Sequence, residues 1–392
     1  MAKRQSRKQQ IQVPVSVGIV IALCILGLYL LQVTGVLDLG LFDTGTPPPT
    51  DTSHEIVPPP TEESGGSSPP ASGEGSIQVY FTTPKYPDTE ADHHGGLDET
   101  VAADIGKARS TVDVAAYQLD LEAVAQALID AHKQGVQVRL VTDSDNVDEP
   151  AVRKLDRAGI PIVEDKREAI MHDKFIVLDH AIVWTGSWNL TVNCTYRNNN
   201  NAVRIVSKAL ADNYAAEFEE MFTDKAFGPG SPANTPHPRL TVGNIPMENY
   251  FAPEDHVADK IVTLLKGAKR SIRFMAFSFT DDRIGQVVRD KAKAGLAVQG
   301  VFEARGSDTE YSEYGRMHRA GLDVLTDGNP YTMHHKVFIL DDAMVLMGSF
   351  NFTQSANEAN DENLLVVRDP AIAALYQAEF ERVYAQAAAA QK

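Results

Sequence analysis

The sequence predicts an α/β protein made of two duplicated halves. A motif of histidine, lysine, aspartate, glycine, serine and asparagine occurs twice, and its two histidines lie 162 residues apart (334 − 172). Apolar runs with strand character alternate with segments of helical period in both halves, which is the pattern of α/β domains. A stretch rich in proline and glycine, residues 228–238, separates the halves as a hinge.

The N-terminus predicts a membrane anchor. Residues 1–12 hold Lys3, Arg4, Arg7 and Lys8 and no acid, and residues 13–35 carry no charge and are largely apolar. About 20 such residues can span a bilayer, and a basic flank stays in the cytoplasm. We therefore expect a single-pass cell-membrane protein with a cytoplasmic N-terminus and an extracytoplasmic catalytic part. A cleaved signal peptide, giving a secreted protein, is the alternative.

Residues 36–75 predict a disordered linker. The segment consists largely of proline, serine, threonine, glycine and acidic residues, including two runs of three prolines. Such a composition offers no apolar side chains for a core, so we expect an extended tether.

Residues 76–228 predict the first half. Strand-like runs occupy 77–81, 112–116 and 136–140, and apolar residues recur at helical spacing over 97–108 and 121–131. Residues 240–388 predict the second half, because they repeat this order. Tyr376 and Phe380 follow Tyr214 and Phe218 at the same offset of 162 residues, so the whole domain is duplicated and not the motif alone.

Each motif predicts two buried strands joined by a turn. The apolar runs 175–178 and 337–340 suit strands that are covered on both faces. Because side chains alternate along a strand, the histidine and the lysine two residues later point the same way. Together with the Gly-Ser-x-Asn turn they predict an oxyanion-binding cluster. The two copies comprise His172, Lys174, Asp179, Ser187 and Asn189, and His334, Lys336, Asp341, Ser349 and Asn351.

The duplicated His-x-Lys-x4-Asp-x6-Gly-Ser-x-Asn pattern resembles that of the phospholipase D superfamily, and the resemblance covers roughly residues 76–385. It implies two α/β sandwich halves packed about a pseudo-two-fold axis, with both motifs at the interface. It also implies a covalent phosphohistidine formed without a cofactor or metal. The resemblance makes the two histidines, two lysines and two asparagines catalytic. We expect Ser187 and Ser349 to bind substrate, and Asp179 and Asp341 to anchor turns.

The copies differ 28 residues beyond each histidine, where Asn200 stands in the first and Glu362 in the second. In related enzymes a residue there orients the imidazole. A carboxylate raises the pKa of a histidine much more than an amide does. We therefore expect Glu362 to keep His334 protonated as the general acid, and Asn200, within the substrate-binding set, to leave His172 free to attack. A loop-capping role for Asn200 is the alternative.

The net charge of −17 weighs against tight binding to a phosphate backbone. Acidity and membrane tethering favour a phospholipid head group as substrate of a phosphodiesterase. An extracellular endonuclease and a phosphatidyltransferase of the cardiolipin synthase type remain alternatives, as does a catalytically inactive binding module. Because one chain holds both motifs, we expect a monomer.

Overall fold

A computed structural model describes residues 73–391, which belong to one compact unit. The predicted membrane segment 13–35 and nearly all of the predicted linker lie outside this range. Within it, no helix is both long enough and apolar enough to cross a bilayer. The last linker residues are already held by the fold, because the amide of Gly75 donates to the carbonyl of Val206.

The first half is a seven-stranded mixed sheet in the order β1-β8-β6-β5-β2-β3-β4. Strands β2, β3 and β4 run parallel, whereas β5, β6, β8 and β1 join by antiparallel pairing. The strands are β1 (Ile77–Phe81), β2 (Thr111–Ala116), β3 (Gln137–Thr142), β4 (Ile162–Glu164), β5 (Lys174–Leu178), β6 (Ile182–Gly186) and β8 (Asn201–Val206).

The second half repeats this sheet and extends it by a hairpin, in the order β13-β12-β11-β15-β16-β17-β10-β9. Strand β10 takes the place of β1, and β9 is the additional edge strand. The strands are β9 (Arg239–Val242), β10 (Ile245–Ala252), β11 (Ser271–Ala276), β12 (Ala297–Phe302), β13 (Asp323–Thr326), β15 (Lys336–Leu340), β16 (Met344–Gly348) and β17 (Glu362–Val367). The prediction of a duplicated α/β fold is confirmed.

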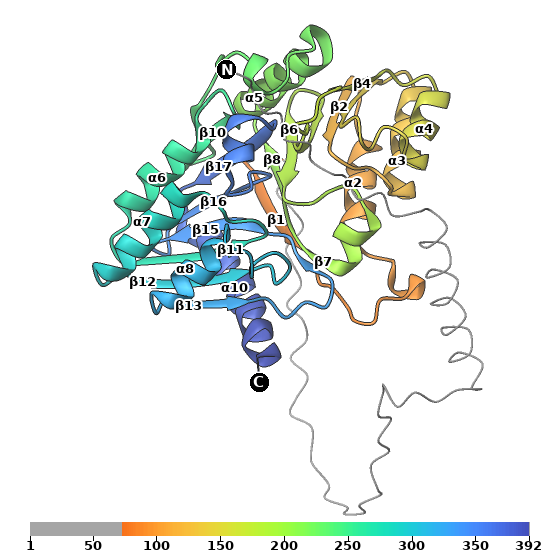
Figure 1. Cartoon of the computed structure of the whole chain (residues 1–392). Coiled ribbons are helices and arrows are strands. Elements are labelled where there is room, and N and C mark those ends of the chain that lie inside the picture. The colour runs from red at the N-terminus through yellow and green to blue at the C-terminus, as the bar shows by residue number, and fades with distance from the viewer. Residues whose placement is uncertain (1–72, 392) are drawn as a thin grey trace, which may run out of the picture. The chain divides into compact units, whose positions relative to one another are not determined.

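Helices cover both faces of each sheet (Figure 1). One apolar core packs α2, α3 and α4 on the first sheet, and a second packs α6, α7 and α8 on the other. A third core lies between the two sheets and contains α5 and α10. The helices are α2 (Leu97–Ile105), α3 (Glu122–Lys133), α4 (Pro150–Arg157), α5 (Lys208–Glu219), α6 (Val257–Gly267), α7 (Asp282–Lys293), α8 (Glu313–Arg319), α9 (Gln354–Glu358) and α10 (Pro370–Ala390).

The shared core explains why strands β5 and β15 are apolar on both faces. Ile176 packs in the outer core of the first half, whereas its neighbours Phe175 and Val177 pack in the shared core. A strand with a core on each side cannot alternate between apolar and polar residues. A short parallel pair, β7 (Asn198–Asn199) with β14 (Thr332–Met333), joins the halves directly beside the motifs.

Buried carboxyl groups make the stability of this fold depend on pH. Burial raises the pKa of Glu254 and Asp361 to about 8 and that of Glu220 and Asp173 to about 7. The unfolded chain has already lost these protons at pH 6.5, whereas the folded protein still holds them. Ionisation between pH 6.5 and 8 therefore opposes the folded state. The four carboxyls outnumber the two buried motif lysines, whose lowered pKa values act in the opposite direction.

We predict that the midpoint of thermal unfolding is lower at pH 8 than at pH 6.5. The Glu254→Gln protein should show a smaller difference between the two pH values, because it cannot ionise at that position. The exposed Glu90→Gln change is the matched control and should leave the difference as it is. Calorimetry of residues 67–392 measures this, and equal or rising midpoints at pH 8 would contradict it.

Candidate active site

The two motifs meet where the halves face each other. The backbone amide of His172 donates to the carbonyl of Asp361, and the amide of His334 donates to the carbonyl of Asn199, each at 2.9 Å. Both histidines thus sit just before a central strand, each held by backbone of the opposite half. The His172 and His334 residues are 5% and 7% exposed, so the site is enclosed and excludes most water.

Each imidazole is held by a side chain from the other half. The Nδ1 of His172 lies 2.8 Å from Oε2 of Glu362, and the Nδ1 of His334 lies 2.9 Å from Oδ1 of Asn200. The predicted pairs, Glu362 with His334 and Asn200 with His172, are therefore wrong. Sequence reasoning assigned each partner to the histidine of its own copy, whereas the packing of the halves exchanges the partners.

The orientation of Asn200 fixes the proton of His334. Its Nδ2 donates to the carbonyl of Cys194 at 2.9 Å, so its Oδ1 faces the imidazole. A second acceptor, the carbonyl of Ser187, lies 3.0 Å from the same Nδ1. With only acceptors around it, Nδ1 carries a hydrogen and Nε2 remains for chemistry.

Burial and nearby charges shift the pKa values of both Glu362 and His172. Burial raises the pKa of Glu362 to about 8, although Lys174, the hydroxyl of Ser349 and Lys336 lower it. Burial and the two lysines also hold the pKa of His172 well below its usual value. The imidazole is therefore neutral in the free protein, and Glu362 is placed to stabilise it when positive charge develops on the ring.

Ser187, Ser349 and Asn200, which the sequence assigned to substrate binding, are turned inward. All three are fully buried. The hydroxyl of Ser187 donates to Oδ1 of Asn200 at 3.0 Å, and that of Ser349 accepts from the backbone amide of Asn363 at 3.0 Å. We therefore assign these three residues to holding the imidazoles rather than to contact with substrate.

The two lysines supply positive charge inside the site. The Nζ of Lys174 donates to the carbonyl of His172 at 2.5 Å, and the Nζ of Lys336 to that of His334 at 2.8 Å. Burial lowers the pKa of Lys174 to about 8 and that of Lys336 well below its usual value. A bound anion offsets this cost of burial, so an anionic substrate favours the charged lysines.

An aromatic ring stands against each motif. The ring centroid of Tyr117 lies 5.0 Å from that of His172, and Phe277 lies 4.6 Å from His334. The Nζ of Lys174 is 5.2 Å from the Tyr117 centroid, and that of Lys336 is 4.5 Å from the Phe277 centroid. Both aromatic residues directly follow the strand that pairs with the motif strand, and sequence reasoning did not single them out.

The motif asparagines keep free acceptors at the site. The side-chain oxygens of Asn189 and Asn351 are buried and have no hydrogen-bond partner among the described residues. Within residues 73–391, no group of three or more histidine, cysteine or acidic side chains is placed to hold a metal ion. The motif side chains at the site are imidazole, ammonium and amide groups.

Asp179 and Asp341 take structural positions away from the imidazoles. Each ends its strand in the left-handed conformation, with φ of 52° and 54°. The carboxylate of Asp179 accepts from the amides of residues 109–111, and that of Asp341 from the amides of residues 269–271. Each aspartate thus ties the motif strand to the start of its neighbour.

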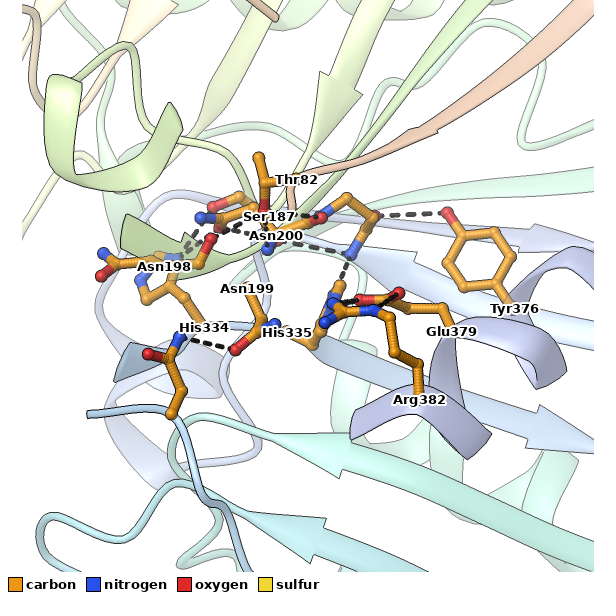
Figure 2. A network of polar contacts seen from close by, with 12 residues as sticks. Thr82, Ser187, Asn198, Asn199, Asn200, His334, His335, Tyr376, Glu379 and Arg382 are labelled. Atoms are coloured by element: carbon orange, nitrogen blue, oxygen red, sulfur yellow. Dashed lines mark hydrogen bonds and ion pairs between the residues drawn. The ribbon is translucent and has the colours of Figure 1, made fainter. Parts of the chain in front are cut away.

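A second layer of paired residues also recurs at the offset of 162. Asn201 and Asn363 each donate from backbone and side chain to the motif serine, and each accepts from a helix tyrosine, Tyr376 or Tyr214. Figure 2 shows this layer on the His334 side. The repeat of Tyr214 at Tyr376 was visible in the sequence, but its contact with the other half was not.

The geometry defines a two-histidine site of the phospholipase D type, and comparison with known proteins agrees. The family model described as "Cardiolipin synthase, PLD-like domain" matches residues 101–222 and 261–384, more than half of the chain. The chain therefore belongs to the phospholipase D superfamily.

Two named relatives are similar to part of the chain in sequence, and a solved structure is similar to it in fold. A phospholipase D of Rickettsia bellii is 31% identical over 150 residues, which is 37% of this chain and 75% of that protein. The mitochondrial cardiolipin hydrolase of Chlamydomonas reinhardtii is 32% identical over 125 residues, 32% of this chain and 56% of that protein. The chain thus spans about half the length of the cardiolipin hydrolases it matches. The phosphatidylserine synthase of Haemophilus influenzae Rd KW20 shares the fold, with a TM-score of 0.58 at 14% identity over 78% of this chain and 85% of that one.

We predict that Glu362→Gln slows the reaction with every substrate, including those with good leaving groups. An amide stabilises positive charge on His172 less than a carboxylate does, and losing such stabilisation costs about 100-fold in rate. The rate of first-turnover nitrophenolate release from a p-nitrophenyl phosphodiester measures the change. The matched Asn200→Ala change, on the other histidine, should spare this substrate, and equal losses in both variants would contradict the assignment.

Proposed function

We propose that the protein is a phosphodiesterase that cleaves phospholipid head groups through a phosphohistidine intermediate. The observation that carries the proposal is the unequal support of the two imidazoles, a carboxylate on His172 and neutral acceptors on His334. One histidine cannot attack phosphorus and protonate the leaving group in the same step. Two facing histidines with different partners divide these tasks.

His172 is the nucleophile in this proposal. Its Nε2 attacks phosphorus, the bond from phosphorus to the head-group oxygen breaks, and the ring becomes cationic. The hydrogen on Nδ1 of His172 stays bonded to Glu362, whose carboxylate stabilises the cation. His172 thus keeps its predicted role as nucleophile, but for a different physical reason. The carboxylate contacts the nucleophile and not the general acid.

His334 is the general acid. Burial, Lys336 and Lys174 hold the pKa of His334 well below its usual value in the free protein. A bound phosphodiester carries negative charge beside the ring and raises that pKa, so protonation accompanies binding. The Nε2 proton passes to the leaving oxygen. The neutral Nε2 then accepts a proton from water, whose oxygen displaces His172 from phosphorus.

Lys174, Lys336, Asn189 and Asn351 hold the nonbridging phosphoryl oxygens. Charge in phosphoryl transfer is spread over these oxygens, and preorganised donors in an enclosed site stabilise it. Of each asparagine side chain, the Nδ2 group is the one that donates to the phosphate, because the oxygens of Asn189 and Asn351 can only accept hydrogen bonds. This arrangement gives each motif one ammonium and one amide for the phosphate.

Net charge and the named relatives favour a phospholipid over a nucleic acid as the substrate. The formal net charge of −17 opposes long polyanions, and matched relatives are named phospholipase D and cardiolipin hydrolase. Residues 67–392 should be assayed side by side on phosphatidyl lipids, single-stranded DNA and duplex DNA, with EDTA present. Faster turnover of DNA would replace this proposal with an endonuclease, and product phosphatidyl alcohols without free phosphatidate would indicate a transferase.

We predict that His172→Ala abolishes reaction with all substrates, whereas His334→Ala still releases nitrophenolate from a p-nitrophenyl phosphodiester in the first turnover and is slowed in the later hydrolysis of the phosphohistidine. The nitrophenolate leaves without a proton, while an alkyl leaving group loses about 10²–10⁴-fold without its acid. Quenched reactions followed by mapping of the phosphorylated peptide identify the nucleophile. Phosphate on His334 would reverse the roles, and its absence from both would remove the covalent step.

We also propose that residues 13–35 anchor the catalytic part on the extracytoplasmic side of the cell membrane. The proposal rests on the uncharged run and its basic flank. A reporter enzyme that works only after export, fused after Gly66, should be active in cells. Replacing Lys3, Arg4, Arg7 and Lys8 by glutamine should lower that activity, and activity of a cytoplasm-only reporter at the same position would overturn the topology.

A further inference from the structure

The residue between the histidine and lysine of each motif differs between the copies, and it faces the same kind of group in both. The first copy has Asp173 and the second has His335, and both are fully buried. The Nδ2 of Asn363 donates to Oδ1 of Asp173 at 2.6 Å. The Nδ2 of Asn201 lies 3.0 Å from Nδ1 of His335. The position therefore requires a hydrogen-bond acceptor that faces an asparagine amide.

A carboxylate meets this requirement directly, whereas an imidazole meets it in one tautomer only. The Nε2 of His335 lies 2.9 Å from Oε1 of Glu379. Arg382 donates to both oxygens of that carboxylate, at 2.7 and 2.8 Å. Burial tends to raise the pKa of Glu379, but the bonds from His335 and Arg382 outweigh it and lower that pKa. The carboxylate is therefore ionised and accepts from Nε2, which leaves the lone pair of His335 on Nδ1.

A chain of hydrogen bonds through Asn201, Ser187 and Asn200 joins His335 to the catalytic imidazole of His334 (Figure 2). Asn201 donates to Ser187 Oγ from its backbone amide at 3.1 Å and from Nδ2 at 3.3 Å. Because Ser187 Oγ accepts both of these bonds, its own hydrogen is free to be donated to Oδ1 of Asn200. The same Oδ1 also accepts from Nδ1 of His334. Tyr376 completes the set by donating to Oδ1 of Asn201 at 3.2 Å, which holds the amide in this orientation.

We propose that His335, held as its neutral Nε2–H tautomer by Glu379 and Arg382, is a positioning residue for His334. The Nδ1 lone pair of His335 accepts from Asn201 as a carboxyl oxygen of Asp173 accepts from Asn363. Loss of that acceptor frees Asn201 to turn its amide, and Ser187 and Asn200 lose their fixed directions. The inference rests on the proposed function, because it places the network behind the general acid. It extends the site to α10, which carries Tyr376, Glu379 and Arg382.

The first test determines the tautomer of His335 and requires no activity measurement. Nitrogen-15 NMR of the histidine-labelled wild-type protein at pH 7.5 should show His335 with a pyridine-type Nδ1 and a protonated Nε2. The spectrum of the His335→Leu protein assigns the signal by its absence among the 11 histidines. A protonated Nδ1, or an imidazolium, would overturn the proposal whether or not the protein is a phosphodiesterase.

The second test separates positioning from folding by means of the leaving group. His335→Leu should lower kcat on an alkyl phosphodiester about 10- to 100-fold, less than complete loss of the acid. It should change the first-turnover rate of nitrophenolate release from the p-nitrophenyl ester less than threefold, because that step needs no acid. The matched Asp173→Leu change removes the corresponding acceptor on the side of the nucleophile, and it should slow the reaction of both substrates. Equal losses on both substrates in His335→Leu would overturn the positioning role.

The third test restores the acceptor. His335→Asp combined with Glu379→Gln places the acceptor of the first copy in the second and removes the facing like charge. This double variant should recover most of the alkyl-ester activity lost in His335→Leu, and failure to recover it in a folded protein would count against the acceptor requirement. His334→Ala runs alongside: equal loss of both esters there would reject the acid role of His334, while the NMR result would still decide the tautomer.

Discussion

The hydrogen bond that each catalytic imidazole makes across the interface is the interaction on which the rest of the site depends. Neither half is a site alone, because the residue that orients His172 belongs to β17 and the one that orients His334 directly precedes β8. The shared core, with α5 and α10 between the sheets, holds the halves in the register that these bonds require. Burial then makes every polar group in the interface dependent on a partner, since an unpaired buried donor or acceptor is costly.

This dependence explains both the success and the failure of the sequence analysis. Spacing located the motif residues, and periodicity located the strands and helices, because both are local properties of the chain. The partners of His172 and His334 are not local. Glu362 follows His334 by 28 residues, yet it contacts His172, and only the packing of the halves decides between the two. The inward turn of Ser187 was equally invisible, because its direction depends on Asn200 and Asn201.

The exchange of partners also changes the meaning of the asymmetry. A carboxylate beside a general acid would keep that histidine charged in the resting protein. The same carboxylate beside a nucleophile stabilises charge only as the bond to phosphorus forms, which lowers the barrier instead of stabilising the ground state. Asn200 cannot take on charge, so His334 is free to lose its proton once a leaving group develops negative charge. In the proposed mechanism, one difference in the acceptor thus gives two nearly identical sets of residues different tasks.

The residues behind the two imidazoles also differ in charge between the halves. On the His172 side the second layer ends in two carboxyl groups, those of Asp173 and Glu217. Burial is the main cause that raises the pKa of Glu217 well above its usual value, and the nearby Glu254 and Asp173 add to it. On the His334 side the equivalent positions are His335 and Glu379, and Arg382 replaces Glu220. An ion pair therefore balances one side, while protonated acids balance the other. Because both sides deliver an acceptor to their asparagine, the duplicated fold has kept the hydrogen-bond pattern while changing the groups that make it.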